Sequence, residues 1–247
     1  LELVKAAKQN ADKVVVSIFV NPTQFGEGED FESYPRTEQQ DSEALAAHKV
    51  DVLFLPPVEE IYYPNAKTII TVSGISDLHC GASRKGHFAG VATIVCKLFN
   101  MVQPDLAFFG EKDFQQLAVI RLMVRDLNIP VSIESVKIIR ETDGLAMSSR
   151  NGYLTEAQRL IAPNLYKALC NARDTILEKK IDFAEIEQQQ QQTLNKAGFE
   201  VDYFSICRTT DLLAANKEDT EIVILAAAKL GKPRLIDNIY FKIPAST

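Results

Sequence analysis

The first half of the chain alternates short apolar runs with amphipathic segments. The apolar runs, rich in β-branched residues, predict strands at residues 14–20, 52–55, 67–72, 106–109 and 131–136. Helical periodicity between them predicts helices at residues 41–49, 91–102 and 115–127. Strands without a polar face are typical of buried parallel sheets. Their alternation with helices therefore predicts an α/β fold with a doubly wound parallel sheet.

The second half has a different order of elements. A capping-box pattern that starts at Thr155 predicts a long helix to residue 177, and a second helix is expected at 183–196. The five consecutive glutamines 188–192 favour a solvated helix face over a prion-like tract. Strands are predicted at 201–207, 221–228 and 235–243. Two helices followed by clustered strands indicate a smaller α+β domain, so we expect domains at residues 1–138 and 139–247.

Composition narrows the function classes. The 247 residues carry a net charge of −6, which disfavours a protein that coats nucleic acid. No apolar run approaches the roughly 20 residues of a membrane span. The four cysteines are isolated and lack metal-ligand spacing, so we expect reduced thiols in a cytoplasmic protein and no protein-held metal.

The segment around Gly110 carries the clearest chemical signal. An apolar strand stops at this glycine, Lys112 follows, and a helix begins directly afterwards. Glycine allows a close backbone approach to a ligand, and a helix start offers unpaired N–H groups to an anion. Lysine adds a point charge that suits a phosphate. The pattern predicts an anion site at the carboxyl end of the strand.

Polar residues also follow other predicted strands, at the edge where open α/β sheets bind ligands. Gln24 follows the first strand, and the cations Arg84, Lys112, Arg140 and Arg150 are expected near one face. In an acidic protein, this collection indicates a polyanionic small molecule, and a nucleoside triphosphate is the simplest candidate.

Each of these residues also has a structural interpretation. Asp113 and Gln116 fit a capping box, and Gln24 could only stabilise a turn. Ser148, Ser149 and Arg150 could form a polar turn. His87 is more typical of a hydrogen-bonded loop histidine than of a catalyst. Asp41 fits a helix start better than a place near magnesium.

Six segments together resemble the pantothenate synthetase (pantoate–β-alanine ligase) family. They follow the family order over almost the whole chain: VSIFVNPTQF at 16–25, YPRT at 34–37, HFAGV at 87–91, FGEKDFQQ at 109–116, DGLAMSSRN at 143–151 and RLIDN at 234–238. The resemblance implies a Rossmann-like domain of the nucleotidyltransferase type, a C-terminal lid and a homodimer. It also implies an AMP-forming ligase that makes pantothenate from pantoate and β-alanine through pantoyl adenylate, with ATP as substrate and Mg²⁺ as cofactor.

The resemblance implies roles for particular residues. Gln24 and Gln116 match positions that hold pantoate, and Gln24 also matches a β-alanine contact. The ATP-binding positions are Gly110, Glu111, Lys112, Asp113, Ile139, Met147, Ser148, Ser149 and Arg150. Among these, Lys112, Ser148, Ser149 and Arg150 match residues of the catalytic machinery.

One departure from the family concerns its His-x-Gly-His segment. No histidine here has that spacing, and the first four residues resemble those directly after the motif. We therefore expect the natural protein to be longer than this sequence. Two alternatives stay open: a related adenylyltransferase that acts on another small acid, and an inactive nucleotide-binding fragment.

Overall fold

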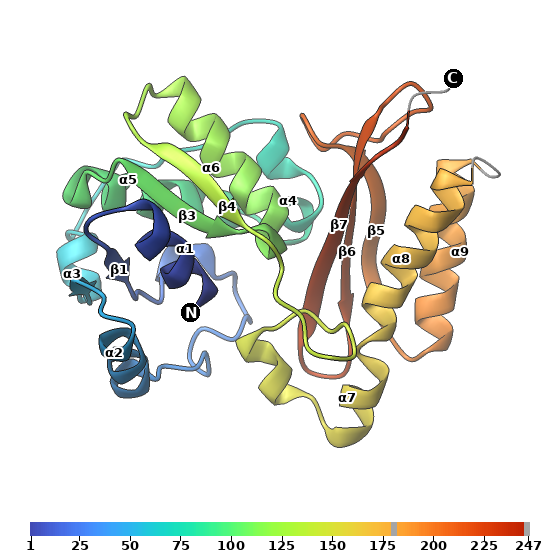
Figure 1. The fold of residues 1–247 in the computed structure, drawn as a ribbon, viewed down its shortest axis with the longest axis horizontal. Coiled ribbons are helices and arrows are strands. Elements are labelled where there is room, and N and C mark those ends of the chain that lie inside the picture. Colours follow the sequence, from blue (N-terminus) through green and yellow to red (C-terminus); the bar gives the residue numbers. More distant parts are fainter. Residues whose placement is uncertain (179–181, 245–247) are drawn as a thin grey trace. The chain divides into compact units, whose positions relative to one another are not determined.

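The computed structural model describes residues 1–178 and 182–244, and the chain divides into two units. Unit 1 is Leu1–Lys137 and unit 2 is Ile138–Thr247. Figure 1 shows the parallel strands of unit 1 and the antiparallel strands of unit 2. No helix in the described part of the chain has the length and apolar character needed to cross a membrane.

Unit 1 contains short parallel strands and helices. Its elements are α1 (Glu2–Asn10), β1 (Val15–Ser17), α2 (Glu38–Ala47), β2 (Val52–Phe54), α3 (Val58–Ile61), α4 (Cys80–Ser83), α5 (His87–Val102), β3 (Leu106–Gly110), α6 (Phe114–Asp126) and β4 (Ser132–Val136). Three 3₁₀ turns lie between them: η1 (Pro22–Gln24), η2 (Ile75–Asp77) and η3 (Glu111–Asp113).

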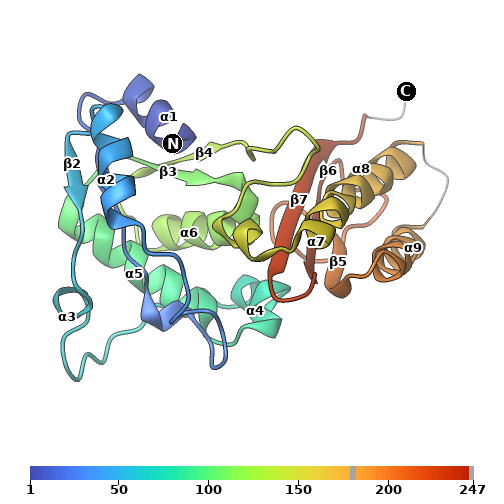
Figure 2. The ribbon, with the colours of Figure 1, turned by 90° about the horizontal axis from the view of Figure 1, so that it is seen from below.

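The strands of unit 1 pair in parallel, which confirms the predicted α/β class. They form two pairs, β1 with β2 and β3 with β4. Helices α1 and α6 lie on opposite faces of the β3–β4 pair (Figure 2). In this pair Gly110 lies opposite Val136, so β3 and β4 end together at one edge of the sheet.

The predicted strand at 67–72 is wrong. These residues form no strand, and most of them are exposed. The amide of Ile70 donates instead to the Thr93 hydroxyl on α5, at 2.9 Å. A β-branched sequence favours extended backbone, but a strand also needs a neighbour with which to exchange ladder bonds.

Unit 2 is an antiparallel sheet covered by helices. Strands β5 (Glu200–Arg208), β6 (Glu221–Lys229) and β7 (Arg234–Lys242) are ordered β5-β6-β7. Helices α8 (Asn164–Leu177) and α9 (Phe183–Lys196) cover one face (Figure 1). Between this face and the two helices lies a core of fully buried Leu, Ile, Phe and Ala side chains. The predicted α+β organisation is confirmed.

The long helix expected after Thr155 is interrupted. The capping box is present, since the Thr155 hydroxyl accepts from the Gln158 amide and the Gln158 side chain accepts from the Thr155 amide. However, the structure has α7 (Glu156–Ile161), then Pro163, then α8. Proline has no N–H to donate and clashes with the preceding turn, so one continuous helix is disfavoured.

The glutamine run on α9 is only partly a solvated face. Gln188, Gln189 and Gln192 are exposed, whereas Gln190 is buried. The Gln191 amide reaches the Phe204 carbonyl of β5 at 3.4 Å. A helix turns through 100° per residue, so five consecutive positions cannot all face water beside a sheet.

Candidate functional site

The end of β3 has the geometry expected of a ligand-facing loop. Gly110 has φ −79°, a value open to any residue, and a Cβ placed there would meet nothing within 4 Å. Neither the backbone nor packing among the described residues therefore requires glycine here. Lys112 lies in η3, directly before α6. The Glu111 carboxylate accepts from Ser135 of β4 at 2.8 Å, which ties this turn to the sheet.

The capping alternative for Asp113 is wrong. Asp113 is the N-cap of α6 by position, but its side chain makes no capping bond. The exposed Asp113 carboxylate therefore does not cap the start of α6. Gln116 is partly buried on the first turn of α6.

Sequence reasoning missed Gln115, the neighbour of Gln116. Its amide nitrogen donates to the carbonyls of Ile75 (2.8 Å) and Leu78 (2.7 Å), and its oxygen accepts from the Cys80 amide (3.1 Å). Gln115 is only 5% exposed. It is therefore a structural anchor for the segment that leads into α4.

A neutral network holds the turn that carries Gln24. Asn21 is buried, and its amide donates to Gln24 Oε1 (3.1 Å) and to the Gly90 carbonyl of α5 (3.2 Å). Its oxygen accepts from the hydroxyls of Thr23 (2.9 Å) and Tyr62 (2.8 Å). We call this set the Asn21 network. It fixes the Gln24 side chain from one side and directs the turn onto α5.

His87 holds the same turn through the backbone. Its Nδ1 lies 2.8 Å from the Gln24 carbonyl, and its Nε2 lies 3.0 Å from Nη1 of Arg84. Arginine can only donate, so Nε2 accepts and the proton is on Nδ1. Burial, with a smaller contribution from Arg84, lowers the pKa of His87 from 6.5 to about 4. The structural interpretation of His87 is therefore supported.

Asp113 is close enough to His87 to act on its charge. The Asp113 carboxylate opposes the decrease in the His87 pKa, as do Glu29 and the bond to the Gln24 carbonyl. The electrostatic influence of Asp113 relates the start of α6 to the Gln24 turn. Asp113 at the start of α6 and His87 beside the Gln24 turn are therefore within electrostatic range of each other.

The remaining candidate residues belong to unit 2. Ile139 and Met147 are both exposed, at 41% and 48%, and the Met147 amide donates to the Ile139 carbonyl at 2.9 Å. The Ser148 hydroxyl accepts from the Arg150 amide at 3.3 Å and caps η4 (Ser149–Tyr153). The polar-turn interpretation thus describes the local structure, and it leaves the side chain of Ser149 exposed.

Arg84 and Arg140, which were predicted to lie near the phosphates, each have a carboxylate partner. Arg84 forms a double hydrogen bond with Glu29, at 2.7 and 2.5 Å. Arg140 does the same with Asp237, at 2.6 and 2.9 Å. We correct the expectation for both residues, because a guanidinium matched to a carboxylate has little charge left for a phosphate.

The described residues contain no group of three or more His, Cys, Asp and Glu side chains suited to holding a metal. All four cysteines lie in the described part, and none of them forms a disulfide. Asp41 lies in the first turn of α2 and accepts from the Thr37 hydroxyl at 3.0 Å, which supports the helix-start interpretation.

The fold and these loops define an α/β protein of the Rossmann-like type with an additional α+β unit. The family model described as pantoate-beta-alanine ligase matches residues 1–240. The chain therefore belongs to the pantoate–β-alanine ligase family, whose members are AMP-forming ligases that make an amide bond.

Relatives and solved structures agree with this assignment. A pantothenate synthetase from Idiomarina loihiensis is 57% identical, with 97% of this chain and 85% of the relative aligned. One from Hahella chejuensis is 55% identical, over 97% and 85%. The crystal structure of the Thermus thermophilus enzyme matches with a TM-score of 0.92 and 44% identity, over 96% of this chain and 87% of that one.

A second solved structure carries ligands. The pantoate-beta-alanine ligase from Francisella tularensis, described as complexed with beta-gamma ATP and beta-alanine, matches with a TM-score of 0.81 and 36% identity. The alignment covers 96% of this chain and 83% of that one.

Proposed function

We propose that this protein condenses pantoate with β-alanine to give pantothenate, with ATP converted to AMP and pyrophosphate. The observation that carries the proposal is the family match, which extends through both units. The geometry at the end of β3 and at the Gln24 turn supports it, because these loops offer the charge and the amide groups that the two half-reactions need.

In the first half-reaction, the pantoate carboxylate attacks the α-phosphate of ATP. The new bond is a mixed anhydride, and pyrophosphate leaves. Negative charge accumulates on the phosphates, where Lys112 and Arg150 would stabilise it. Asp113 would lie near the ribose, and the backbone of Ile139 near the adenine. Gly110 and Glu111 would shape the loop, while Met147, Ser148 and Ser149 would cover the triphosphate.

In the second half-reaction, the β-alanine amine attacks the carbonyl carbon of pantoyl adenylate and AMP leaves. Gln24 and Gln116 would hold pantoate through its hydroxyls and carboxylate. Neutral amides suit this task because they orient a carboxylate nucleophile without pairing it with a cation. A phosphorylated acceptor would favour Arg or Lys at these two positions.

Several further features belong to the proposal. Magnesium would sit on phosphate oxygens and water, as is usual for this ion, because the described residues provide no cluster of carboxylates. It would neutralise phosphate charge.

Unit 1 would bind nucleotide and pantoate, and unit 2 would act as a lid. We also propose a homodimer, from the family resemblance, and a cytoplasmic location, which four cysteines outside any disulfide support.

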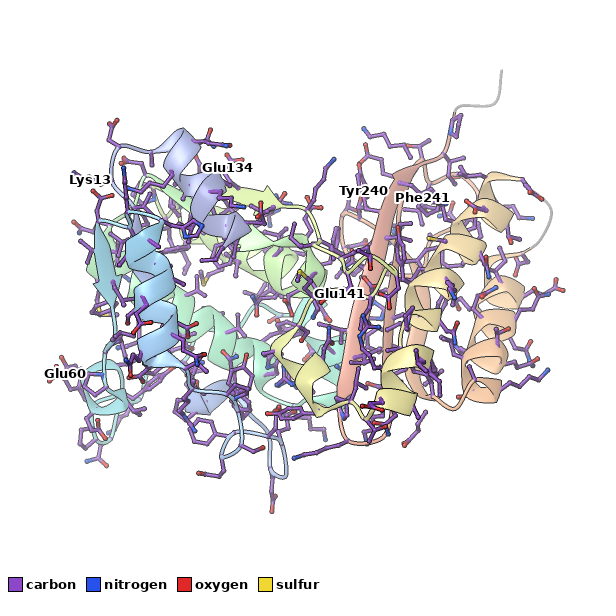
Figure 3. The ribbon with its side chains drawn as sticks, turned by 60° about the horizontal axis from the view of Figure 1, so that its bottom comes forward. Lys13, Glu60, Glu134, Glu141, Tyr240 and Phe241 are labelled. Atoms are coloured by element: carbon purple, nitrogen blue, oxygen red, sulfur yellow. The ribbon has the colours of Figure 1, made fainter. Side chains whose placement is uncertain are left out.

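The test is pyrophosphate exchange into ATP that depends on pantoate, followed by AMP release that depends on β-alanine. Lys112→Ala should lower the exchange rate about 10²–10³-fold, the usual effect of removing one charge-stabilising contact. Lys13→Ala is the matched control, because Lys13 (Figure 3) is a highly exposed lysine of unit 1 that precedes β1 and is paired with Asp51.

Other outcomes identify other functions. Exchange without pantoate would indicate a related adenylyltransferase. Tight ATP binding without any exchange would indicate a nucleotide-binding protein that does not turn over. Gln116→Ala should raise the pantoate concentration needed for half-maximal exchange, and an unchanged value would remove Gln116 from the pantoate site.

A further inference from the structure

One guanidinium in unit 2 has an unusually complete set of partners. Arg140 donates to both oxygens of Asp237, to the Gly144 carbonyl (3.1 Å) and to the Asn238 carbonyl (3.3 Å). Its Cζ lies 3.6 Å from the ring centroid of Tyr166 on α8. The Asp237 side chain is only 3% exposed. Arg140 thus joins a loop, a strand and a helix.

Arg140 lies within a small hairpin, residues 139–147. Arg140 and Ala146 form an antiparallel bridge, and the Glu141 amide donates to the Leu145 carbonyl at 2.8 Å. The Met147 amide donates to the Ile139 carbonyl. Figure 3 shows Glu141, the neighbour of Arg140, beside β7. The hairpin contains Ile139 and Met147 and leads directly into Ser148 and Arg150.

We propose that Arg140 and Asp237 are positioning residues, which set the geometry of the 147–150 segment for the triphosphate. The role of that segment rests on the proposed function. The guanidinium itself is matched to a carboxylate, so it acts through the backbone that it holds. Within the hairpin it fixes the turn through Gly144, and outside the hairpin it fixes the whole loop to β7.

The energetics of a buried ion pair favour this role over simple stabilisation. Removing two charges from water consumes most of their mutual attraction, so such a pair adds little net stability compared with apolar side chains. What it provides is direction, because a bidentate guanidinium–carboxylate pair has one planar geometry. A phosphate-binding loop needs this property, since a displacement of about 1 Å can cost about 10²-fold in rate.

Gly144 shows how closely the hairpin is fitted to α8. Its φ is +95°, and a Cβ added there would lie 2.7 Å from Cδ1 of Tyr166. The glycine allows the turn to approach the ring on which Arg140 stacks. The same three residues thus set the distance of the hairpin from the helix.

The experiment compares two Arg–Asp pairs of the same unit. Arg140→Lys and Asp237→Asn alter the pair that touches the hairpin. Arg234→Lys and Asp202→Asn alter a control pair between β7 and β5, with Nη2 2.6 Å from Oδ2. The Cζ of Arg234 lies 5.7 Å from the ring centroid of Tyr203, farther than that of Arg140 from Tyr166. The control pair joins two strands of the sheet, and neither of its residues belongs to the hairpin.

The first measurement is hydrogen exchange in the folded proteins. Arg140→Lys and Asp237→Asn should raise the exchange rate of the Glu141 and Met147 amides at least about tenfold, while β6 amides keep theirs. The control variants should leave both sets unchanged. Equal exchange of the two hairpin amides in all five proteins would overturn the positioning role.

The second measurement is kinetic. The two hairpin variants should raise the KM for ATP and lower kcat about 10–100-fold, with the KM for β-alanine within about twofold of the wild type. Control variants that change ATP use equally would show a general structural effect and overturn the proposal. If the wild type lacks pantoate-dependent exchange, the proposed function fails, and hydrogen exchange with direct ATP titration still decides the positioning claim.

Discussion

The Gln24 turn of unit 1 and the 139–147 hairpin of unit 2 are held by different sets of contacts. Most of the groups that fix the turn are uncharged, namely the Asn21 network and His87, and the Arg84 guanidinium, which is paired with Glu29, adds a bond to the Gln24 carbonyl at 3.3 Å. The hairpin is fixed by a buried charge pair and a stacked ring. Under the proposed function, the Gln24 turn would bind pantoate and β-alanine, and the segment that follows the hairpin would bind the triphosphate. We therefore expect different substitutions and conditions to destabilise the turn and the hairpin, which makes the comparison testable.

The largest effect should come from breaking the charged device completely. Arg140→Met removes the Arg140 guanidinium from the buried Asp237 carboxylate. We expect the free energy of unfolding to fall by about 3–5 kcal/mol, the usual cost of removing one partner of a buried pair. Urea denaturation measures this loss. Arg234→Met, which frees the more exposed Asp202, should cost about 1 kcal/mol or less, and equal losses would contradict the comparison.

The next effect concerns packing between the turn and α5. A Cβ at Gly90 would lie 2.5 Å from the Thr23 carbonyl oxygen and 2.8 Å from the Gln24 nitrogen. Gly90→Ala should therefore displace η1, cost about 3 kcal/mol, and raise the KM for pantoate. Gly110→Ala is the control, with open space at its Cβ, and should change stability by less than about 0.5 kcal/mol. Similar stabilities of the two variants would be evidence against the close fit.

The third effect is a loss of stability at low pH, caused by protonation of His87 at the Gln24 turn. The His87 pKa is about 4 in the folded protein and 6.5 ordinarily, so the unfolded chain binds its proton more tightly. The stabilisation is complete above pH 6.5 and is lost progressively as pH falls from there to about 4. At pH 5 the expected loss is about 2 kcal/mol relative to pH 7. Urea unfolding of His87→Gln should lack this pH dependence, and an identical profile in both proteins would exclude His87 as its source.

The smallest losses of stability are expected from removing the hydroxyl of Tyr62 or of Tyr166. The Tyr62 hydroxyl bonds to Asn21 and lies 3.0 Å from the Thr23 hydroxyl, so Tyr62→Phe should cost about 1 kcal/mol. Tyr166 contacts Arg140 with its ring, and its hydroxyl bonds only weakly because the partner is the Cys170 thiol, so Tyr166→Phe should cost less than about 0.5 kcal/mol. Thermal unfolding compares the two variants directly, and the reverse order would show that the Tyr166 hydroxyl contributes more to stability than the Tyr62 hydroxyl.

Local patterns predicted the elements well where the sequence alone determines them. The helix Phe183–Lys196 agrees in both bounds with its periodicity, and the capping box at Thr155 is present. The helix break at Pro163 was missed, although its signal is visible in the sequence. The segment 67–72 was misassigned because strand formation depends on a partner that the local sequence does not specify.

The adjacent glutamines show why site prediction from sequence is harder than element prediction. Gln115 and Gln116 are the same residue type on the same helix turn, yet Gln115 is bound by three backbone groups. Arg140 is similar, since Asp237 lies 97 positions away and no local pattern joins them. The sequence signal for that contact was the polar pair Asp237-Asn238, which interrupts the apolar run of β7.

The stacking of Arg140 on Tyr166 has a consequence for anyone who exchanges parts between related enzymes. The hairpin cannot be transferred alone, because side chains on α8 and β7 determine its shape as much as its own sequence does. A chimera that imports residues 139–150 alone would separate the loop from the partners that define it. Such a chimera also has to include the residues at positions 166 and 237.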